Sequence, residues 1–325
     1  MSEQQAPLVS VRDLRKHYAL NGDLLRKGAA VKAVDGVSFD IQPGETFGLV
    51  GESGCGKSTL GRAILRLFDI TSGEIHFAGQ AIAHAREKEL KPLRKRMQAI
   101  FQDPYSSLNP GMTVRQLVAE PMQIHGYSRE EQRERTETLL YKVGLKHEHL
   151  ERFPHEFSGG QRQRISIARA LSVHPEFVLC DEPLSALDVS VQAQVVNILQ
   201  DLQQELGLTY LFIAHDLSMV RHISSRIGVM YLGKLVEVAP ANELYQRPAH
   251  PYTRALLAAV PQPDPRIRNL EDATLRGEMP VPTSALPGCK FCSRCPHAMP
   301  VCQTQEPAMQ EIAPGHFAAC WLFNM

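Results

Sequence analysis

The stretch GESGCGKST, from Gly51 to Thr59, decides the fold that this sequence predicts. It fits the pattern G-x-x-x-x-G-K-[ST], with the apolar run FGLV before it and the amphipathic run TLGRAILRLF after it. Its glycines let backbone N–H groups turn inward without a Cβ clash and form a nest for phosphate. We expect Lys57 to place its charge beside the β- and γ-phosphates and the Ser58 hydroxyl to bind Mg²⁺. The stretch predicts an ATP site lined by Gly51, Ser53, Gly54, Cys55, Gly56, Lys57, Ser58 and Thr59.

Length and composition bound the class of protein. The 325 residues suit one large domain with an appendage, and 43% hydrophobic with 22% charged residues is typical of soluble globular proteins. The formal net charge is zero, so we expect no nucleic-acid partner. No apolar run approaches the ~18 residues that a membrane-spanning helix needs. The first residues, MSEQQAPLVS, lack the pattern of a signal peptide. We therefore expect a cytoplasmic protein, which leaves a membrane partner open.

Strands and helices alternate between Leu8 and about Val260, which predicts an α/β fold with a mostly parallel sheet. Apolar runs predict strands covered on both faces at residues 47–50, 177–180 and 210–213. Helices are expected at residues 60–68, 129–143, 161–171 and 191–206.

The run FVLCDE, Phe177 to Glu182, reads as a buried strand that ends in two carboxylates. At the carboxyl end of a parallel strand they would project into a ligand crevice. We expect Asp181 to reach the Mg²⁺ shell and Glu182 to act as the general base on the attacking water. An acidic strand end is common by itself, so other motifs must support this interpretation.

The run Phe157-Ser158-Gly159-Gly160-Gln161 opens a predicted helix and is much rarer. It resembles the LSGGQ signature of the ABC ATPase family, with Phe157 in place of the leading Leu. The substitution changes a packing residue and keeps the Ser-Gly-Gly backbone that faces phosphate in this family. The resemblance spans residues 8–260 and implies a P-loop NTPase fold with a helical subdomain at about residues 103–172.

Further motifs stand in the order that the family has. Gln102 resembles the Q-loop glutamine, which also approaches Mg²⁺, and the run SALD at residues 185–188 resembles the D-loop. His215, after an apolar strand, resembles the switch histidine. Tyr18 resembles the aromatic residue that stacks on adenine, although an insertion at residues 20–31 follows it. The resemblance implies these catalytic residues: Lys57, Gln102, Glu182 and His215.

In this family two subunits close head-to-tail over two nucleotides. The resemblance therefore implies that the signature acts on the γ-phosphate held by the opposite subunit. The residues assigned to that role are Ser158, Gly159, Gly160 and Gln161. Within the phosphate loop, Cys55 is either a low-pKa thiol beside a helix N-terminus or a filler of a variable position, and we favour the second reading.

Two stretches resemble a subfamily, the bacterial dipeptide and oligopeptide importer ATPases: FQDPYSSLNP at residues 101–110 and HPYTRALL at residues 250–257. Nickel importers are close relatives of this subfamily. The resemblance implies a peripheral protein at the cytoplasmic face of the bacterial inner membrane. It implies as partners a homologous second ATPase, two membrane permease subunits and a periplasmic or extracellular peptide-binding protein.

Two alternatives come from other classes. A soluble ABC protein acting on ribosomes or DNA usually carries two cassettes or a coiled-coil insertion, and this sequence shows neither. A metal sensor with a regulatory cassette would not need the intact Glu182 and His215.

After Val260 the sequence holds 10 of its 22 prolines and no sustained period. We expect a cassette at residues 1–260, then a linker and a small loop-rich module at residues 261–325. The spacing Cys289-x5-Cys295-x6-Cys302-x17-Cys320 is similar to that of the same importer ATPases, where it implies a [4Fe-4S] cluster. Four thiolates also suit Zn²⁺, which stays the alternative. Cys292 is additional to the pattern, and we expect a structural role for the metal.

Overall fold

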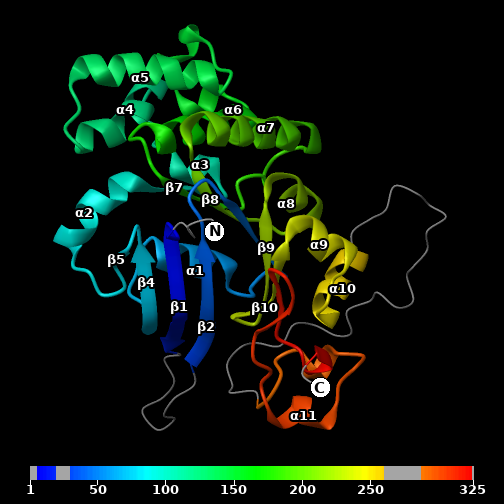
Figure 1. Ribbon diagram of the computed structural model, residues 1–325. Coiled ribbons are helices and arrows are strands. Elements are labelled where there is room, and N and C mark those ends of the chain that lie inside the picture. The colour runs from blue at the N-terminus through cyan, green and yellow to red at the C-terminus, as the bar shows by residue number, and fades with distance from the viewer. Residues whose placement is uncertain (1–5, 20–29, 260–286, 324–325) are drawn as a thin grey trace, which may run out of the picture. The chain divides into compact units, whose positions relative to one another are not determined.

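The computed structural model describes residues 6–19, 30–259 and 287–323 (Figure 1). These residues fall into two compact units. The first unit contains Ile41–Thr46, His84–Ala214 and the residues up to Leu8. The second contains Val9–Asp40, Phe47–Ala83 and the chain from His215 onward. The predicted domain boundary after residue 260 and the predicted linker lie outside the described residues, so both stay predictions.

The first unit contains three parallel strands: β6 (Met97–Ile100), β7 (Phe177–Asp181) and β8 (Thr209–Ile213). Strand β7 lies between the other two, and every residue of β7 and β8 is buried. Burial on both faces explains why these strands are apolar throughout rather than alternating. The strands predicted at residues 177–180 and 210–213 are thus confirmed.

Helices form the rest of the first unit. They are α2 (Glu87–Arg96), α3 (Pro104–Ser107), α4 (Val114–Ile124), α5 (Arg129–Lys142), α6 (Gly159–Leu171) and α7 (Val189–Leu206), with short 3-10 turns at His147–His149 and Pro154–Glu156. Helices α4, α5 and α6 begin at capping boxes, in which a Ser or Thr hydroxyl and a Glu or Gln side chain each accept a backbone N–H. Helices predicted at residues 129–143, 161–171 and 191–206 are confirmed.

The second unit contains two sets of strands. One is an antiparallel sheet in the order β2 (Ala30–Ile41), β1 (Val9–Ala19), β4 (Ser72–Phe77), β5 (Gln80–Ala81). In the other, β3 (Thr46–Val50) lies parallel to β9 (Arg226–Tyr231), and β10 (Lys234–Pro240), β12 (His316–Ala318) and β11 (Gln310–Ala313) continue it antiparallel. The expectation of a mostly parallel sheet is therefore wrong for this unit.

The helices of the second unit are short. They are α1 (Lys57–Ile64), α8 (Leu217–Ile223), α9 (Ala241–Gln246), α10 (Pro251–Ala258) and α11 (Pro300–Thr304), with 3-10 turns at Cys292–Arg294 and Trp321–Phe323. Helix α1 ends four residues before the predicted Phe68. Arg66 takes a left-handed φ of 53° and donates to the carbonyls of Ile82 and Phe68. These bonds fix a turn where the apolar pattern alone predicts more helix.

The carboxy-terminal extension, residues 287–323, does not stand apart from the sheet of the second unit. Strand β12 pairs with β10, with Glu237 opposite Ala318 and Val238 opposite Phe317. The Glu237 carboxylate is fully buried and accepts hydrogen bonds from the His316 ring at 2.7 Å and from the backbone N–H groups of Ala249 and His250, each at 2.8 Å. The sequence predicts a loop-rich module here, whereas the structure shows strands β11 and β12 paired with each other and with β10. Only a few residues pair, which is too short a run for a period to show.

His250 is the N-cap of α10 and is 1% exposed. Its ring Nδ1 accepts the backbone N–H of Tyr252 at 3.1 Å, so the acceptor must be unprotonated. Burial lowers the pKa of His250 to about 4, against the opposing charge of Glu237. The folded state thus binds fewer protons than the unfolded chain between pH about 4 and about 6.5.

A depressed histidine pKa stabilises the fold fully above pH about 6.5, and the contribution is lost as the pH falls toward about 4. Lowering the pH from about 7 to about 5 should cost wild type about 2 kcal/mol through His250. His250→Asn keeps a capping acceptor that does not titrate, so its unfolding free energy, measured in urea, should fall less over that range. The exposed His147→Asn is the control and should follow wild type. Equal losses in wild type and His250→Asn would contradict the assignment.

Candidate functional site

The phosphate loop of the second unit lies between β3 and α1, as the sequence predicts. Its backbone has positive φ at Gly51 (150°), Gly54 (80°) and Gly56 (108°). A Cβ at Gly51 would lie 2.2 Å from the Met230 carbonyl oxygen, and one at Gly56 would lie 2.0 Å from that of Ala33. Both positions therefore require glycine, because conformation and neighbouring backbone exclude a side chain.

The loop is also held by hydrogen bonds. The Lys57 ammonium is buried and donates to the carbonyl oxygens of Gly51 and Glu52, at 2.8 and 3.2 Å. Gly233, in the turn after β9, donates its N–H to the Cys55 carbonyl at 2.8 Å. Lys57 is thus kept on the loop itself, where its charge is available to an anion that the loop binds.

Cys55 is 1% exposed, and burial raises the pKa of its thiol despite the neighbouring Lys57. The alternative of a low-pKa reactive thiol is therefore wrong. Cys55 fills its position in the loop, as favoured from the sequence.

In the first unit, β6 and β7 are parallel and in register from Met97 with Phe177 to Ile100 with Cys180. Gln102 follows β6, and Asp181 and Glu182 stand at the end of β7. The structure thus brings these three residues to the same edge of the sheet.

Glu182 adopts a left-handed φ of 50°, which is rare for a residue with a side chain. Its backbone N–H donates to the carbonyl of Ile213, the last residue of the parallel neighbour β8, at 2.9 Å. Strained backbone conformations of this kind cluster at active sites and ligand-binding sites. No local sequence signal shows this conformation.

The signature run begins α6. The Ser158 hydroxyl accepts the N–H of Gln161 at 3.4 Å, and the Gln161 side chain accepts the N–H of Ser158 at 3.0 Å. A Cβ at Gly160 would lie 2.3 Å from a Val191 methyl, so this position is also closed to a side chain. Phe157 is 5% exposed and packs edge-on against the ring of His149, in keeping with its predicted packing role.

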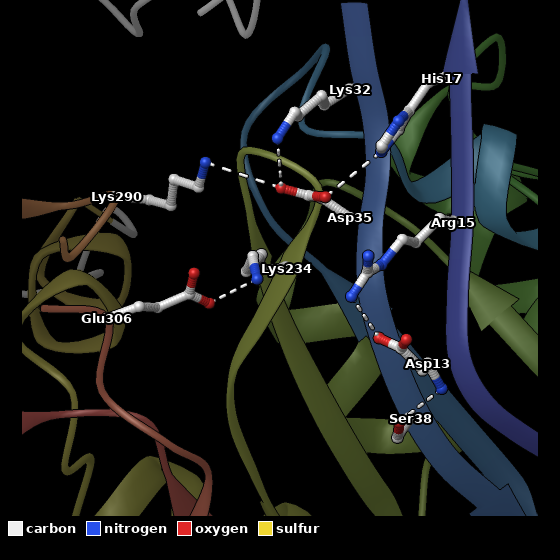
Figure 2. A network of polar contacts seen from close by, with 9 residues as sticks. All are labelled: Asp13, Arg15, His17, Lys32, Asp35, Ser38, Lys234, Lys290 and Glu306. Carbon is white, nitrogen blue, oxygen red and sulfur yellow. Dashed lines mark hydrogen bonds and ion pairs between the residues drawn. The ribbon is translucent and has the colours of Figure 1, made fainter. Parts of the chain in front are cut away.

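Tyr18 and His215 belong to the second unit. Tyr18, on β1, is 41% exposed and packs edge-on against Phe68, so its ring is accessible to a base. The preceding His17 contacts the Asp35 carboxylate at 3.2 Å (Figure 2). The predicted insertion lies largely in residues 20–29, outside the described residues. His215 is exposed and follows β8, one residue before the N-cap of α8.

The four cysteines of the predicted metal site lie near one another, since their thiols act on one another electrostatically. Burial, and then these neighbours, raise the pKa of Cys289 to about 12. Yet among the described residues no group of three or more His, Cys, Asp or Glu side chains could hold a metal ion. The geometry therefore does not support the predicted metal ligands, which are Cys289, Cys295, Cys302 and Cys320.

Two residues of the carboxy-terminal part contact the phosphate loop, and the sequence analysis missed both. Arg294 forms an ion pair with Glu52 at 2.7 Å, and the Tyr252 hydroxyl accepts the Glu52 backbone N–H at 2.9 Å. Opposite charges in the loop and beside the cysteines are the only signal, and 242 residues separate Glu52 from Arg294.

Two family models match the chain. The model described as ABC transporter matches residues 34–185, and that described as oligopeptide/dipeptide transporter, C-terminal region, matches residues 236–302. The Bacillus subtilis protein YkfD is 54% identical, with 99% of this chain and 97% of that protein covered. The oligopeptide transport ATP-binding protein AppF of the same organism is 52% identical, with 98% of each covered.

Solved structures give the same picture of the fold. A dimeric ATP-binding cassette in a post-hydrolysis state with ADP and Pi has a TM-score of 0.65 at 29% identity, covering 72% of this chain and 98% of that chain. CbiO1 from Clostridium perfringens, part of an ABC transporter complex, has a TM-score of 0.66 at 27% identity, covering 75% and 92%.

The glycine geometry predicts a sharp difference between two substitutions. Gly56→Ala places a methyl group 2.0 Å from the Ala33 carbonyl oxygen, so the loop must distort. We expect MgATP affinity, measured by calorimetry, to fall at least about tenfold, as for a loss of about 1.4 kcal/mol. Gly79→Ala is the control: Gly79 has a positive φ of 78° but no neighbour within 4 Å. Its affinity should equal that of wild type, and equal losses in both variants would contradict the steric argument.

Proposed function

The chain belongs to the family of ATP-binding subunits of oligopeptide-type ABC transporters, and from this premise we propose how it works and which residues act. It hydrolyses ATP to power peptide import. The observation that carries this function is full-length similarity at 54% identity, joined to the peptide-type model over residues 236–302. The name of AppF, oligopeptide transport ATP-binding protein, favours peptides over nickel and favours a transporter over a soluble ABC protein.

Hydrolysis is assigned to residues of three motifs: the phosphate loop, the Q-loop and the end of β7. Lys57 neutralises the β- and γ-phosphates, and backbone N–H groups of the loop bind their oxygens. Ser58, Gln102 and Asp181 are the proposed Mg²⁺ ligands, and the ion, when bound, offsets charge on the phosphates. Glu182 accepts a proton from water as that water attacks the γ-phosphorus and ADP leaves. The left-handed backbone of Glu182 supports this role, because such strained conformations cluster at functional sites.

The remaining motif residues have supporting roles in this proposal. His215 contacts the γ-phosphate, and Tyr18 stacks on adenine with its exposed ring. Ser158, Gly159, Gly160 and Gln161 face the nucleotide of a second ATPase subunit, where the N-terminus of α6 stabilises negative charge. The capping bonds between Ser158 and Gln161 support this by fixing that N-terminus.

A peptide importer needs parts that cross the membrane. None of the described helices is long and apolar enough to cross a membrane. We propose a homologous second ATPase, two permease subunits and a peptide-binding protein as partners. The chain then lies at the cytoplasmic face of the inner membrane, where its permease partners span the bilayer.

The cysteine cluster carries a narrower proposal, a [4Fe-4S] centre on Cys289, Cys295, Cys302 and Cys320. Its support is the spacing and the mutual approach of the four thiols. Zinc stays the alternative, since four thiolates suit it as well. No step of hydrolysis passes through the cysteine cluster.

The proposed base is tested by Glu182→Gln, which keeps the shape of the side chain and removes its proton acceptor. Purified in the assembled transporter, this variant should still bind MgATP but hydrolyse it at least about 100-fold more slowly. Glu176→Gln is the control, since Glu176 precedes the same strand and pairs with Arg96 at the surface. Wild-type turnover in Glu182→Gln would remove Glu182 as the base.

The transport function is tested by co-purification. Recovery of the chain only with ribosomes, never with permease subunits, would overturn it.

The metal proposal is tested by elemental analysis of protein purified without exposure to air. We expect about four iron atoms and inorganic sulfide per chain. Cys302→Ala should lose the iron, whereas Cys292→Ala, the additional cysteine, should keep it. A sample that contains zinc, or no metal, would refute the cluster.

A further inference from the structure

The carboxy-terminal extension binds the phosphate loop through Glu52. The Arg294 guanidinium donates to both carboxylate oxygens of Glu52, at 2.7 and 3.1 Å. The Arg294 side chain is 5% exposed and that of Glu52 is 26% exposed. Two parallel N–H···O bonds between charged groups are among the strongest and most directional that side chains form.

The backbone of Glu52 is held as well. Its N–H donates to the hydroxyl of Tyr252, a fully buried residue of α10, at 2.9 Å. Its carbonyl oxygen accepts from Lys57 at 3.2 Å. Glu52 therefore connects the carboxy-terminal part of the chain to the lysine of the phosphate loop.

Aromatic rings fix the position of Arg294. Its guanidinium lies 5.8 Å from the centroid of the Tyr231 ring and contacts the Tyr231 hydroxyl at 3.5 Å. The Tyr231, Tyr252 and Phe291 rings pack on one another with centroids 4.7 to 5.4 Å apart. Because Arg294 is buried against the Tyr231 ring, it loses little further freedom when it binds Glu52.

The extension also forms an ion pair away from the phosphate loop. Lys290 pairs with Asp35 of β2 at 3.7 Å, and Lys32 and His17 approach the same carboxylate (Figure 2). Burial alone would raise the pKa of Asp35, but Lys234, Lys32 and Lys290 together with His17 lower it. Because Lys290 attaches the extension away from the loop, a change there separates the effect of the Arg294–Glu52 ion pair from that of attaching the extension in general.

We propose that Arg294 is a positioning residue for MgATP, acting through Glu52. An unpaired Glu52 carboxylate would repel the phosphates from within the loop, since charges a few ångströms apart interact strongly in a partly buried site. Arg294 neutralises this charge and holds it toward the extension, while Tyr252 fixes the loop backbone. Nucleotide binding and the docking of the extension are therefore coupled, and each strengthens the other. The inference rests on the proposed nucleotide site.

The test is steady-state ATP hydrolysis by the assembled transporter, with KM for MgATP and kcat measured separately. Arg294→Ala should raise KM about tenfold, within the usual range of coupling between sites, and leave kcat within about twofold. Adding Glu52→Gln to Arg294→Ala should restore most of the lost affinity, because the unpaired carboxylate is then gone. A role in folding alone would not give this rescue.

Lys290→Ala is the matched control, since it weakens the extension at Asp35 and leaves the loop contact intact. Its KM should stay within about twofold of wild type. If Arg294→Ala fails to fold, Arg294→Lys, which keeps the charge without the fork, should raise KM by a smaller factor. An unchanged KM in the Arg294 variant, no rescue by Glu52→Gln, or an equal rise in Lys290→Ala would overturn the inference. A wild-type transporter that hydrolyses no MgATP would instead overturn the proposed function.

Discussion

The second unit depends on the hydrogen bonds that the buried carboxylate of Glu237 accepts. It accepts hydrogen bonds from Ala249, His250 and His316, and so it joins β10 to the start of α10 and to β12. A buried charge with its hydrogen bonds made is tolerated, whereas one deprived of a partner costs several kcal/mol. Glu237 therefore helps to hold in place α10, which supplies Tyr252, and the extension, which supplies Arg294.

Local patterns predict those parts of the fold that local physics determines. The strands at Phe177 and Tyr210 are buried on both faces, so each is an unbroken apolar run, and the capped helices carry their start signals in the sequence. The antiparallel pairing of the second unit was missed because it joins residues far apart in the chain, such as Glu237 and Ala318. These strands pair through backbone hydrogen bonds, which no pattern of side chains in the sequence specifies. The early end of α1 depends on Arg66 reaching Ile82, another distant contact.

The candidate site shows the same division. The pattern of the phosphate loop is predictable because Gly51 and Gly56 face neighbouring backbone at 2.2 and 2.0 Å, which allows no other residue. The register of β6 and β7 carries Gln102 to the edge where Asp181 stands, as a parallel sheet requires. The backbone of Glu182 and the ion pair of Arg294 could not be predicted, since each depends on packing between segments far apart in the chain. The cysteine spacing, by contrast, predicted more than the geometry supports.

The distance in sequence between Glu52 and Arg294 also means that the two residues are made at different times during synthesis. A ribosome makes the phosphate loop early and Arg294 242 residues later, and chains fold from the N-terminus as they emerge. The loop of a nascent chain therefore carries an acidic residue whose counter-charge has not yet been translated. Under the proposed role of Arg294, the loop therefore gains its full affinity for MgATP only after residue 294 has been made and has reached Glu52.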